Sequence, residues 1–329
     1  MNNPKQAYDD LNPDRILDAV DDLGLACNGQ LLALNSYENR VYQIGQEDAA
    51  PLIAKFYRPN RWSDEAILEE HSFTQQLADT EIPVVAPMLI RDKTLHYFQG
   101  YRFAVFPRQG GRWPDLEHKQ SLEWMGRFLA RIHSIGRIQR FEHRPKLDVQ
   151  SFGVESVEFI LNSGFLPDYM KPAYSSVSQE LLDKIQNAFA NTYDLRNIRL
   201  HGDCHPGNIL WREESGPHFV DLDDCRMGPA IQDLWMLLSG DHEEMSLQMR
   251  HIIEGYQQFE DFNYSELNLI EALRSLRILH YAAWLARRWE DPAFPFAFPW
   301  FNTPRYWEEH VLSLREQLAA MDEACLDIS

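Results

Sequence analysis

Two polar stretches in the second half of the chain hold the residue types best suited to chemistry. Residues 201–208 read HGDCHPGN, and residues 221–224 read DLDD. Asp203 precedes Asn208 by five positions, and Asp221 follows Asn208 by thirteen. Apolar residues flank both stretches, which is typical of loops held at the ends of buried strands.

These side chains match the few groups that phosphoryl transfer requires. One carboxylate orients the attacking hydroxyl and accepts its proton, while an amide and a second carboxylate hold Mg²⁺ on the triphosphate. Oxygen ligands of this kind suit a hard cation. The spacing from Asp203 to Asn208 is that of a D-x-x-x-x-N catalytic loop, and Asp221 follows where a metal-binding aspartate is expected.

A lysine near the start of the chain supplies the remaining group, a cation for the other phosphates. Lys55 stands at the centre of an apolar run, residues 53–56, where burial of its charge is costly unless it is paired. The following helix offers Glu69 and Glu70. Glu70 lies seven residues before Leu77 and so shares its inward face. We expect Glu70 to pair with Lys55, with Glu69 as the alternative.

Short apolar runs among the first hundred or so residues predict the strands that position Lys55. Each run is bounded by turn residues. The expected strands are residues 30–35, 40–44, 52–57, 96–99 and 101–106, with a hairpin joining the first two. Between the third and fourth, helical spacing predicts a helix over residues 64–77, capped by Ser63 or Asp64.

Helical periodicity dominates the rest of the chain. The expected helices are residues 122–135, 179–193, 233–238, 245–259 and 265–288, and a strand-loop-strand unit at 198–224 interrupts them. A small β-rich half followed by a helical half indicates an α+β fold with a cleft between the halves. Because Pro107 and Gly110-Gly111 break the pattern, we place an N-lobe at residues 1–107 and a C-lobe at residues 108–329.

Composition narrows the range of partners. The formal net charge of −19 opposes a phosphate backbone, so we expect no nucleic-acid partner. The opening residues lack the order of a signal peptide, and no apolar run approaches 18 residues, so we expect no membrane partner. Four cysteines without a CxxC pair indicate reduced thiols in a cytoplasmic protein.

The motifs together resemble a known superfamily. HGDCHPGN followed by FVDLDD resembles the aminoglycoside phosphotransferase and choline kinase superfamily, which has HGD where ordinary protein kinases have HRD. The helix GRFLARIH at residues 126–133, and Gly228-Pro229 followed by Asp233, fit the same pattern. More narrowly, NSYENRVYQIG, KFYRPNRW, ILEEH and RRWEDPAFP resemble the bacterial stress response kinase A family.

This resemblance covers nearly the whole chain and implies a fold and an activity. The fold would be two-lobed and protein-kinase-like, with a small antiparallel β-sheet N-lobe and a larger helical C-lobe. The activity would be ATP-dependent phosphorylation of Ser and Thr hydroxyls on proteins, itself included, in a cytoplasmic stress response. The expected partners are ATP and a protein substrate, the expected cofactor is Mg²⁺, and the chain is expected to act as a monomer.

The resemblance also implies roles for individual residues. Asp203 would accept the proton, and Asn208 and Asp221 would bind Mg²⁺, with Asp221 counted beside Asp203 as catalytic. Asp223 remains an alternative metal ligand, because it stands two positions after Asp221. Lys55 and Glu70 would hold the phosphates.

The loop that would cover the nucleotide departs from the protein-kinase pattern. Ser36 lies in it, but the loop has no G-x-G-x-x-G, so glycines do not ensure a close approach of backbone to phosphate. Ser36 is expected to supply a hydroxyl instead. The chain also lacks an A-P-E segment and leaves little room for an activation loop after Asp221.

Other interpretations of the same residues stay open. A small-molecule kinase of the aminoglycoside, choline or homoserine type would use the same catalytic groups, with acidic residues recognising a cationic acceptor. Those residues would be Asp241, Glu243, Glu244 and Glu290. A nucleotide-sensing pseudokinase is a third hypothesis, although no catalytic residue is missing. His201 and His205 could ligate Zn²⁺, but His201 is better explained as bracing the loop.

The aromatic segment at residues 281–301 has two interpretations. In choline-type kinases, aromatic side chains near this point would cage a quaternary ammonium. The alternative is ordinary packing. Arg287 and Arg288 stand close to Trp284 in the sequence and would oppose a cationic guest.

Overall fold

The computed structural model describes residues 8–328, which divide into two compact units. The first unit contains residues up to 114 together with two later segments, 141–144 and 205–225. The second unit contains residues 115–140, 145–204 and those from 226 onward. This division groups residues by compactness, and the lobe boundary between residues 107 and 108 stays a prediction.

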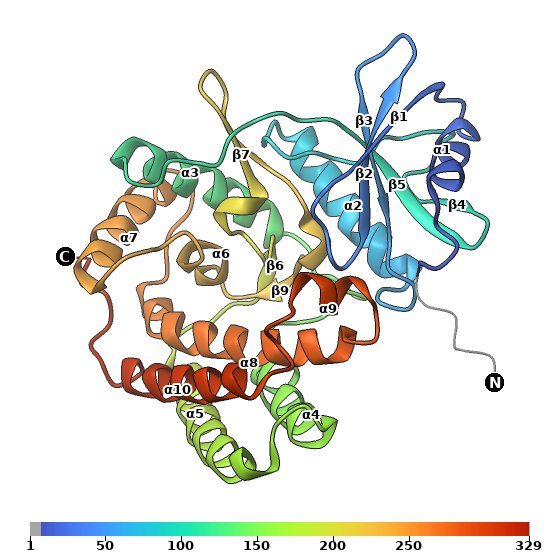
Figure 1. Ribbon diagram of the computed structural model, residues 1–329. Helices are drawn as coiled ribbons and strands as arrows, with labels where there is room; N and C mark the ends of the chain where they lie inside the picture. The colour runs from blue at the N-terminus through green and yellow to red at the C-terminus, as the bar shows by residue number, and fades with distance from the viewer. Residues whose placement is uncertain (1–7, 329) are drawn as a thin grey trace. The chain divides into compact units, whose positions relative to one another are not determined.

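A five-stranded antiparallel sheet forms the centre of the first unit (Figure 1). In spatial order its strands are β1 (Cys27–Ala33), β2 (Arg40–Gln46), β3 (Leu52–Phe56), β5 (Tyr101–Pro107) and β4 (His96–Phe98). All five predicted strands are present, and the first two are neighbours as expected for a hairpin. β1 begins three residues before the predicted start, because Cys27 already pairs with Gln46 on β2.

The side chains of β3 point alternately to two faces of the sheet, one that packs against α1 and one that carries Lys55. Leu52, Ala54 and Phe56 are buried against helix α1 (Pro13–Asp21). Successive side chains of a strand point to opposite faces, so Lys55 faces the other way. The sequence patterns had not predicted α1, although Asn12 caps it by accepting a hydrogen bond from the Arg15 backbone N–H at 2.9 Å.

Helix α2 (Asp64–Asp79) matches the predicted helix and its cap. The Ser63 hydroxyl accepts a hydrogen bond from the Ala66 backbone N–H at 3.2 Å, so Ser63 is the N-cap. Its buried stripe includes Glu70 and Leu77. The inward orientation that spacing predicted for Glu70 is therefore confirmed.

The segment at 205–225 adds a second small sheet to the first unit. Strand β7 (Ile209–Arg212) pairs with β8 (Gly216–Phe219). A short 3₁₀ turn, η3 (Pro206–Asn208), precedes this hairpin, and another, η4 (Leu222–Asp224), follows it. The hairpin thereby brings the two polar stretches of the sequence to the same end of one small sheet.

The second unit is helical (Figure 1). Its α-helices are α3 (Lys119–Gly136), α4 (Glu155–Ser163), α5 (Lys171–Asn191), α6 (Ile231–Trp235), α7 (His242–Tyr256), α8 (Ile270–Arg288), α9 (Ala293–Ala297) and α10 (Pro304–Ala320). Short π or 3₁₀ segments are η1 (Gln150–Val154), η2 (Asp168–Met170) and η5 (Tyr264–Leu269), and strand β6 (Ile198–Leu200) pairs with β9 (Arg226–Gly228). The overall class is α+β, as predicted.

Several helix boundaries differ from the prediction. The predicted helix at 265–288 starts as the 3₁₀ segment η5, and α8 begins only at Ile270. The predicted helix at 233–238 is the five-residue α6, displaced toward the N-terminus. The helices α4 and α10 were not predicted. Amphipathic spacing located α3, α5, α7 and α8, whereas boundaries depend on tertiary contacts that the pattern does not contain.

Helices α3 and α7 cross with their backbones in close contact. A Cβ atom built on Gly126 would lie 1.9 Å from the Ile252 carbonyl oxygen, and one on Gly255 would lie 2.1 Å from the Glu123 oxygen. Glycine is therefore required at both positions, because any side chain would force the helices apart.

No helix within residues 8–328 is both long enough and apolar enough to cross a membrane. The four cysteines are free thiols.

Candidate active site

Lys55 is at the centre of a charged cluster inside the first unit. Its ammonium nitrogen lies 3.0 Å from Asp221 Oδ1, 3.1 Å from Asp223 Oδ1 and 3.4 Å from Glu70 Oε1. On β3, Lys55 stands between Val41 of β2 and Ala104 of β5 in the strand register. Residues far apart in the sequence, Lys55 and Asp221, thus meet within hydrogen-bond distance.

The carboxylates keep this buried lysine charged. Only 5% of Lys55 is exposed. Burial alone would lower the pKa of its ammonium group, but the charges of Asp221, Asp223 and Glu70 hold that pKa well above its usual range. The site therefore carries a permanent cation, as the binding of phosphate groups would require.

Two adjacent glutamates of α2 have different partners. Glu70 contacts Lys55, whereas the carboxylate of Glu69 accepts hydrogen bonds from the backbone N–H groups of Glu142, His143 and Arg144 at 2.6 to 2.9 Å. The structure therefore favours Glu70 over Glu69 as the partner of Lys55.

Arg144 holds the far side of Glu70. Its guanidinium lies 2.7 Å from Glu70 Oε2 and 2.7 Å from the Ala66 carbonyl oxygen, and it also donates to the Asp223 carbonyl. The Arg144 side chain is fully buried. One oxygen of Glu70 thus binds Lys55 while the other binds Arg144, which fixes the orientation of the carboxylate.

Asp221 and Asp223 differ in exposure and partners. The Asp223 side chain is buried and forms ion pairs with both Lys55 and Arg61. The Asp221 side chain is 52% exposed. Asp221 also has a left-handed backbone, with φ of 58°, which is a strained conformation for a residue other than glycine. The accessible carboxylate is therefore Asp221, and Asp223 serves as an internal counter-ion.

Asn208 is tied to Asp221 through the backbone. The Val220 N–H donates to the Asn208 carbonyl oxygen at 3.0 Å, one residue before Asp221. The ring nitrogen Nδ1 of His205 accepts a hydrogen bond from the Gly207 N–H at 3.0 Å and so caps the turn that carries Asn208. These contacts place the amide and the carboxylate on neighbouring segments.

A cavity of about 370 Å³ within the first unit collects most of the predicted site residues. Ser36, Lys55, Glu70, Asn208 and Asp221 all line it. The remaining lining side chains are mostly apolar and include Leu34, Val41, Ile53, Val85, Phe106, Leu210 and Leu222. The cavity therefore combines apolar walls with a cation, carboxylates and an amide, which is the usual composition of a small-molecule site.

Asp203 belongs to the second unit, two residues before the chain enters the first unit at His205. Its carboxylate lies 2.7 Å from the guanidinium of Arg277 on α8, and its side chain is 25% exposed. The contact with Arg277 was not predicted.

A buried aspartate anchors the backbone beside Asp203. Asp233 of α6 accepts hydrogen bonds from the His201 N–H at 2.9 Å and the Gly202 N–H at 2.8 Å. Burial alone would raise the pKa of Asp233, but hydrogen bonds from His133 and the Gly202 backbone hold it below its usual value. The start of the HGD stretch is therefore fixed by a charged, fully buried carboxylate.

Comparison with known proteins shows which family the chain belongs to. A model of the phosphotransferase enzyme family matches residues 30–270. The chain belongs to this phosphotransferase family. Stress response kinase A of Escherichia coli K12 is 44% identical to it over 329 residues, which cover all of this chain and 99% of the relative. The resemblance read from the motifs is confirmed.

Two further proteins are also similar to this chain. Serine/threonine protein kinase RdoA of Salmonella typhimurium LT2 is 42% identical over the full chain and 99% of its own length. Among solved structures, amicoumacin kinase hAmiN, in complex with AMP-PNP and Ca²⁺, aligns with a TM-score of 0.73 at 18% identity over 94% of each chain. The phosphotransferase therefore has the predicted two-lobed kinase-like fold.

The phosphotransferase offers a metal ion few ligands of its own. Within residues 8–328, no three His, Cys, Asp or Glu side chains are grouped to hold a metal. Mg²⁺, however, is commonly bound through one or two protein oxygens together with substrate phosphates and water. Asn208 and the half-exposed Asp221 line one cavity and supply such oxygens, so the residues present fit Mg²⁺.

Sequence reasoning missed the arginines of the phosphotransferase's site. Arg61 pairs with Asp223 and Asp224, and Arg144 pairs with Glu70. Arg277 pairs with Asp203. Arg61 lies inside the KFYRPNRW motif, but an arginine has no fixed spacing from its partner across a fold, so no local pattern identifies it.

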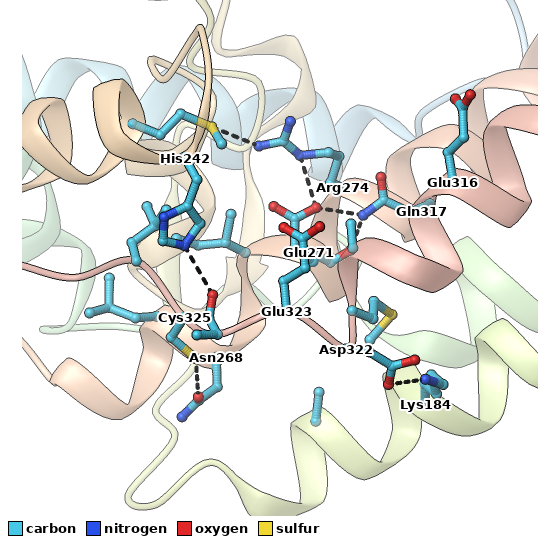
Figure 2. Close-up of a pocket in the computed structure, with 18 of the residues that line it drawn as sticks. Lys184, His242, Asn268, Glu271, Arg274, Glu316, Gln317, Asp322, Glu323 and Cys325 are labelled. Atoms are coloured by element: carbon cyan, nitrogen blue, oxygen red, sulfur yellow. Dashed lines mark hydrogen bonds and ion pairs between the residues drawn. The ribbon is translucent and has the colours of Figure 1, made fainter.

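A larger cavity, of about 800 Å³, lies in the second unit among α5, α8, α10 and the C-terminal residues 321–326 (Figure 2). Its basic side chains are paired: Arg274 with Glu271, and Lys184 with Asp322. The Cys325 thiol donates to Asn268 Oδ1 at 2.7 Å. None of the predicted site residues lines it.

Proposed function

We propose that this phosphotransferase is an ATP- and Mg²⁺-dependent protein kinase that phosphorylates Ser and Thr hydroxyls. One observation carries the proposal: the carboxylates of Glu70 and Asp221 lie within 3.4 Å of the Lys55 ammonium nitrogen. All three residues line a cavity that Asn208 also lines. A pseudokinase would be expected to lack one of these groups.

The cavity residues divide between the two ends of a nucleotide. Phe106 and Pro107 at the end of β5, and Gln109 just after it, would receive the adenine. Lys55, oriented by Glu70, would hold phosphate oxygens, and the Ser36 hydroxyl would donate to them in place of a glycine-rich loop. Lys55 would then exchange part of its contact with Asp221 for contacts with phosphate.

Asn208 and Asp221 would hold Mg²⁺ on the triphosphate. When bound, the ion would neutralise charge that develops on the transferred group. The buried Asp223, paired with Arg61, would keep the η4 turn and hence Asp221 in place.

Asp203 would act as the base. Its carboxylate accepts the proton of the acceptor hydroxyl as the oxygen–phosphorus bond forms, and the bond from the γ-phosphorus to the bridging oxygen breaks to release ADP. The products are a phosphate monoester and ADP, and the proton leaves later from Asp203. Asp233 would keep the loop that carries Asp203 rigid.

The names of the relatives support a protein acceptor. Relatives named stress response kinase A and serine/threonine protein kinase RdoA match the chain end to end at 42 to 44% identity. Autophosphorylation, a stress role, the cytoplasmic location, the monomeric state and the lobe boundary at 107/108 remain parts of this proposal. A small-molecule kinase is the second candidate, favoured by the fold shared with amicoumacin kinase hAmiN.

Label transfer from γ-labelled ATP distinguishes the two candidates. The purified chain is incubated with Mg²⁺ and either a generic protein substrate or a panel of amino alcohols, sugars and aminoglycosides. We expect label on protein and on the enzyme itself. Label on a metabolite alone, with no labelled protein, would remove the protein-kinase proposal while leaving the phosphotransferase assignment intact.

A further inference from the structure

A cation accompanies the proposed base in the second unit. The Arg277 guanidinium lies 2.7 Å from Asp203, and 46% of the Arg277 side chain is exposed. Arginine has five donors in a planar fork and keeps its charge, so it can bind a second carboxylate while it contacts Asp203. This feature stands out in a chain whose net charge is −19.

Further basic and aromatic residues lie on the same face of α8 as Arg277. On α8, Arg277, Tyr281, Trp284 and Arg288 recur at intervals of four, three and four residues, which places them along one face. Tyr281 is 40% exposed, and its ring stacks on Trp284 with centroids 5.6 Å apart. Two arginines therefore flank two aromatic side chains along this face of α8.

The segment around α9 extends the aromatic part. Trp284 contacts Phe298 at 6.0 Å between ring centroids, and Phe298 contacts Trp300 at 5.9 Å. Trp300 is 43% exposed and Phe296 is 90% exposed. Arginine with tyrosine and tryptophan is the composition enriched at protein-binding hot spots.

We propose that this face of α8 and α9, defined by Arg277, Tyr281, Trp284, Arg288 and Trp300, docks the acceptor, and that the acceptor is a polypeptide segment with acidic residues beside its Ser or Thr. The inference rests on the proposed function and names the substrate class of the same site. Arg277, Tyr281 and Trp300 of this surface are exposed, and the surface begins at the proposed base.

Charge complementarity decides against a cationic acceptor here. Arg277, Arg287 and Arg288 place three positive charges on α8. An aminoglycoside or choline brought to Asp203 would meet the Arg277 charge directly, whereas a glutamate beside the acceptor hydroxyl would be attracted to it. Glu290, one of the acidic residues considered for a cationic acceptor, follows Arg288 by two positions.

Two peptides test the proposal. Both contain one serine, flanked on each side by two glutamates in the first and two lysines in the second. Because an exposed charge pair contributes about 0.7 kcal/mol, or about threefold, two such pairs predict a kcat/KM ratio of about tenfold in favour of the acidic peptide. The ratio should fall as ionic strength rises.

Variants locate the preference on this face. Each variant is assessed by its own ratio of kcat/KM for the acidic peptide to kcat/KM for the basic peptide. A general loss of rate lowers both values alike, so the ratio can be measured even if Arg277→Gln slows the reaction. We expect Arg277→Gln and Arg288→Gln each to reduce the ratio to about threefold or less. Arg288 lies eleven residues after Arg277 along α8, so it serves if Arg277→Gln is inactive. Tyr281→Ala should raise KM for both peptides alike.

Arg305 provides the matched control, because it is an exposed arginine of the same unit that pairs with Glu309 on α10. Arg305→Gln should leave the ratio at about tenfold. A wild-type ratio of one or below overturns the proposal, as does a ratio that both α8 variants leave unchanged. Failure of the proposed function is distinct: neither peptide would be labelled, and a metabolite would be.

Discussion

At the residue scale, two aspartates two positions apart show what sequence can and cannot assign. Asp221 and Asp223 are equivalent by composition and spacing, and the motif alone left both open as metal ligands. Arg61 decides between them, because it binds Asp223 and makes it an internal counter-ion. Asp221 is left half-exposed in the cavity. The arginine comes from a distant part of the sequence, which is why spacing did not reveal the difference.

Replacing the proposed base tests its role. Asp203→Ala should lower kcat by about 10²- to 10⁴-fold, because proton acceptance is lost while the cavity of the first unit is untouched. Asp233→Ala provides a comparison, since it removes the anchor of the same loop and should also lower the stability of the fold. Initial rates of ADP release measure the turnover of both variants, and urea denaturation measures their stability. Turnover by Asp203→Ala close to that of wild type would mean that the base is misassigned.

The buried arginine behind Glu70 should matter more for stability than an ordinary ion pair does. Arg144→Met leaves Glu70 with a carboxylate oxygen unpaired in the interior, and we expect the free energy of unfolding to fall by about 3 kcal/mol. Arg102→Met is the matched control, because its pair with Asp64 is far more exposed and is expected to contribute at most about 1 kcal/mol. Urea denaturation measures both, and equal losses would contradict this account of Glu70.

At the element scale, period-2 and helical patterns predicted the five strands, the inward face of α2 and the helices α3, α5, α7 and α8. These sequence patterns are local, and the structure forms the elements that they predict. The short α6 was displaced from its predicted position because contacts from elsewhere define its start: Glu266 of η5 accepts a hydrogen bond from the Ile231 N–H at 3.0 Å. A cap supplied from 35 residues away leaves no local signal.

The Glu266 cap predicts a pH dependence of stability. Burial raises the pKa of Glu266 from 4.5 to about 7. Between these pH values the folded state holds the proton more tightly than the unfolded state, so stability falls as pH rises through this window. The penalty reaches about 3 kcal/mol above pH 7, since one pKa unit corresponds to about 1.4 kcal/mol.

Glu266→Gln removes the titrating group while keeping an oxygen that can accept from Ile231. We expect the difference in unfolding free energy, wild type minus Glu266→Gln, to decrease between pH 4.5 and pH 7.5. Thermal or urea unfolding across that range measures the difference. A difference that is flat with pH, or that rises, would show that Glu266 does not titrate in this window.

At the scale of the whole molecule, two groups of positive charge carry the proposed function of this acidic chain. Lys55 and Arg144 are buried among carboxylates in the first unit, where Arg61 pairs with Asp223, while Arg277 and Arg288 lie on α8 in the second. The global fold class followed from the order of strand-rich and helix-rich halves. The assignment of residues 141–144 and 205–225 to the first compact unit did not, because it depends on long-range contacts such as those between Glu69 and Arg144.

The central claim is that the cavity of the first unit binds Mg²⁺-ATP through Asp221 and Lys55, separately from proton acceptance by Asp203. Calorimetric titration of Mg²⁺-ATP into wild type, Asp203→Ala and Asp221→Ala tests it most directly. We predict that Asp203→Ala binds within about threefold of wild type and that Asp221→Ala binds at least about tenfold more weakly. Unchanged binding by Asp221→Ala, with binding lost in Asp203→Ala, would contradict the account.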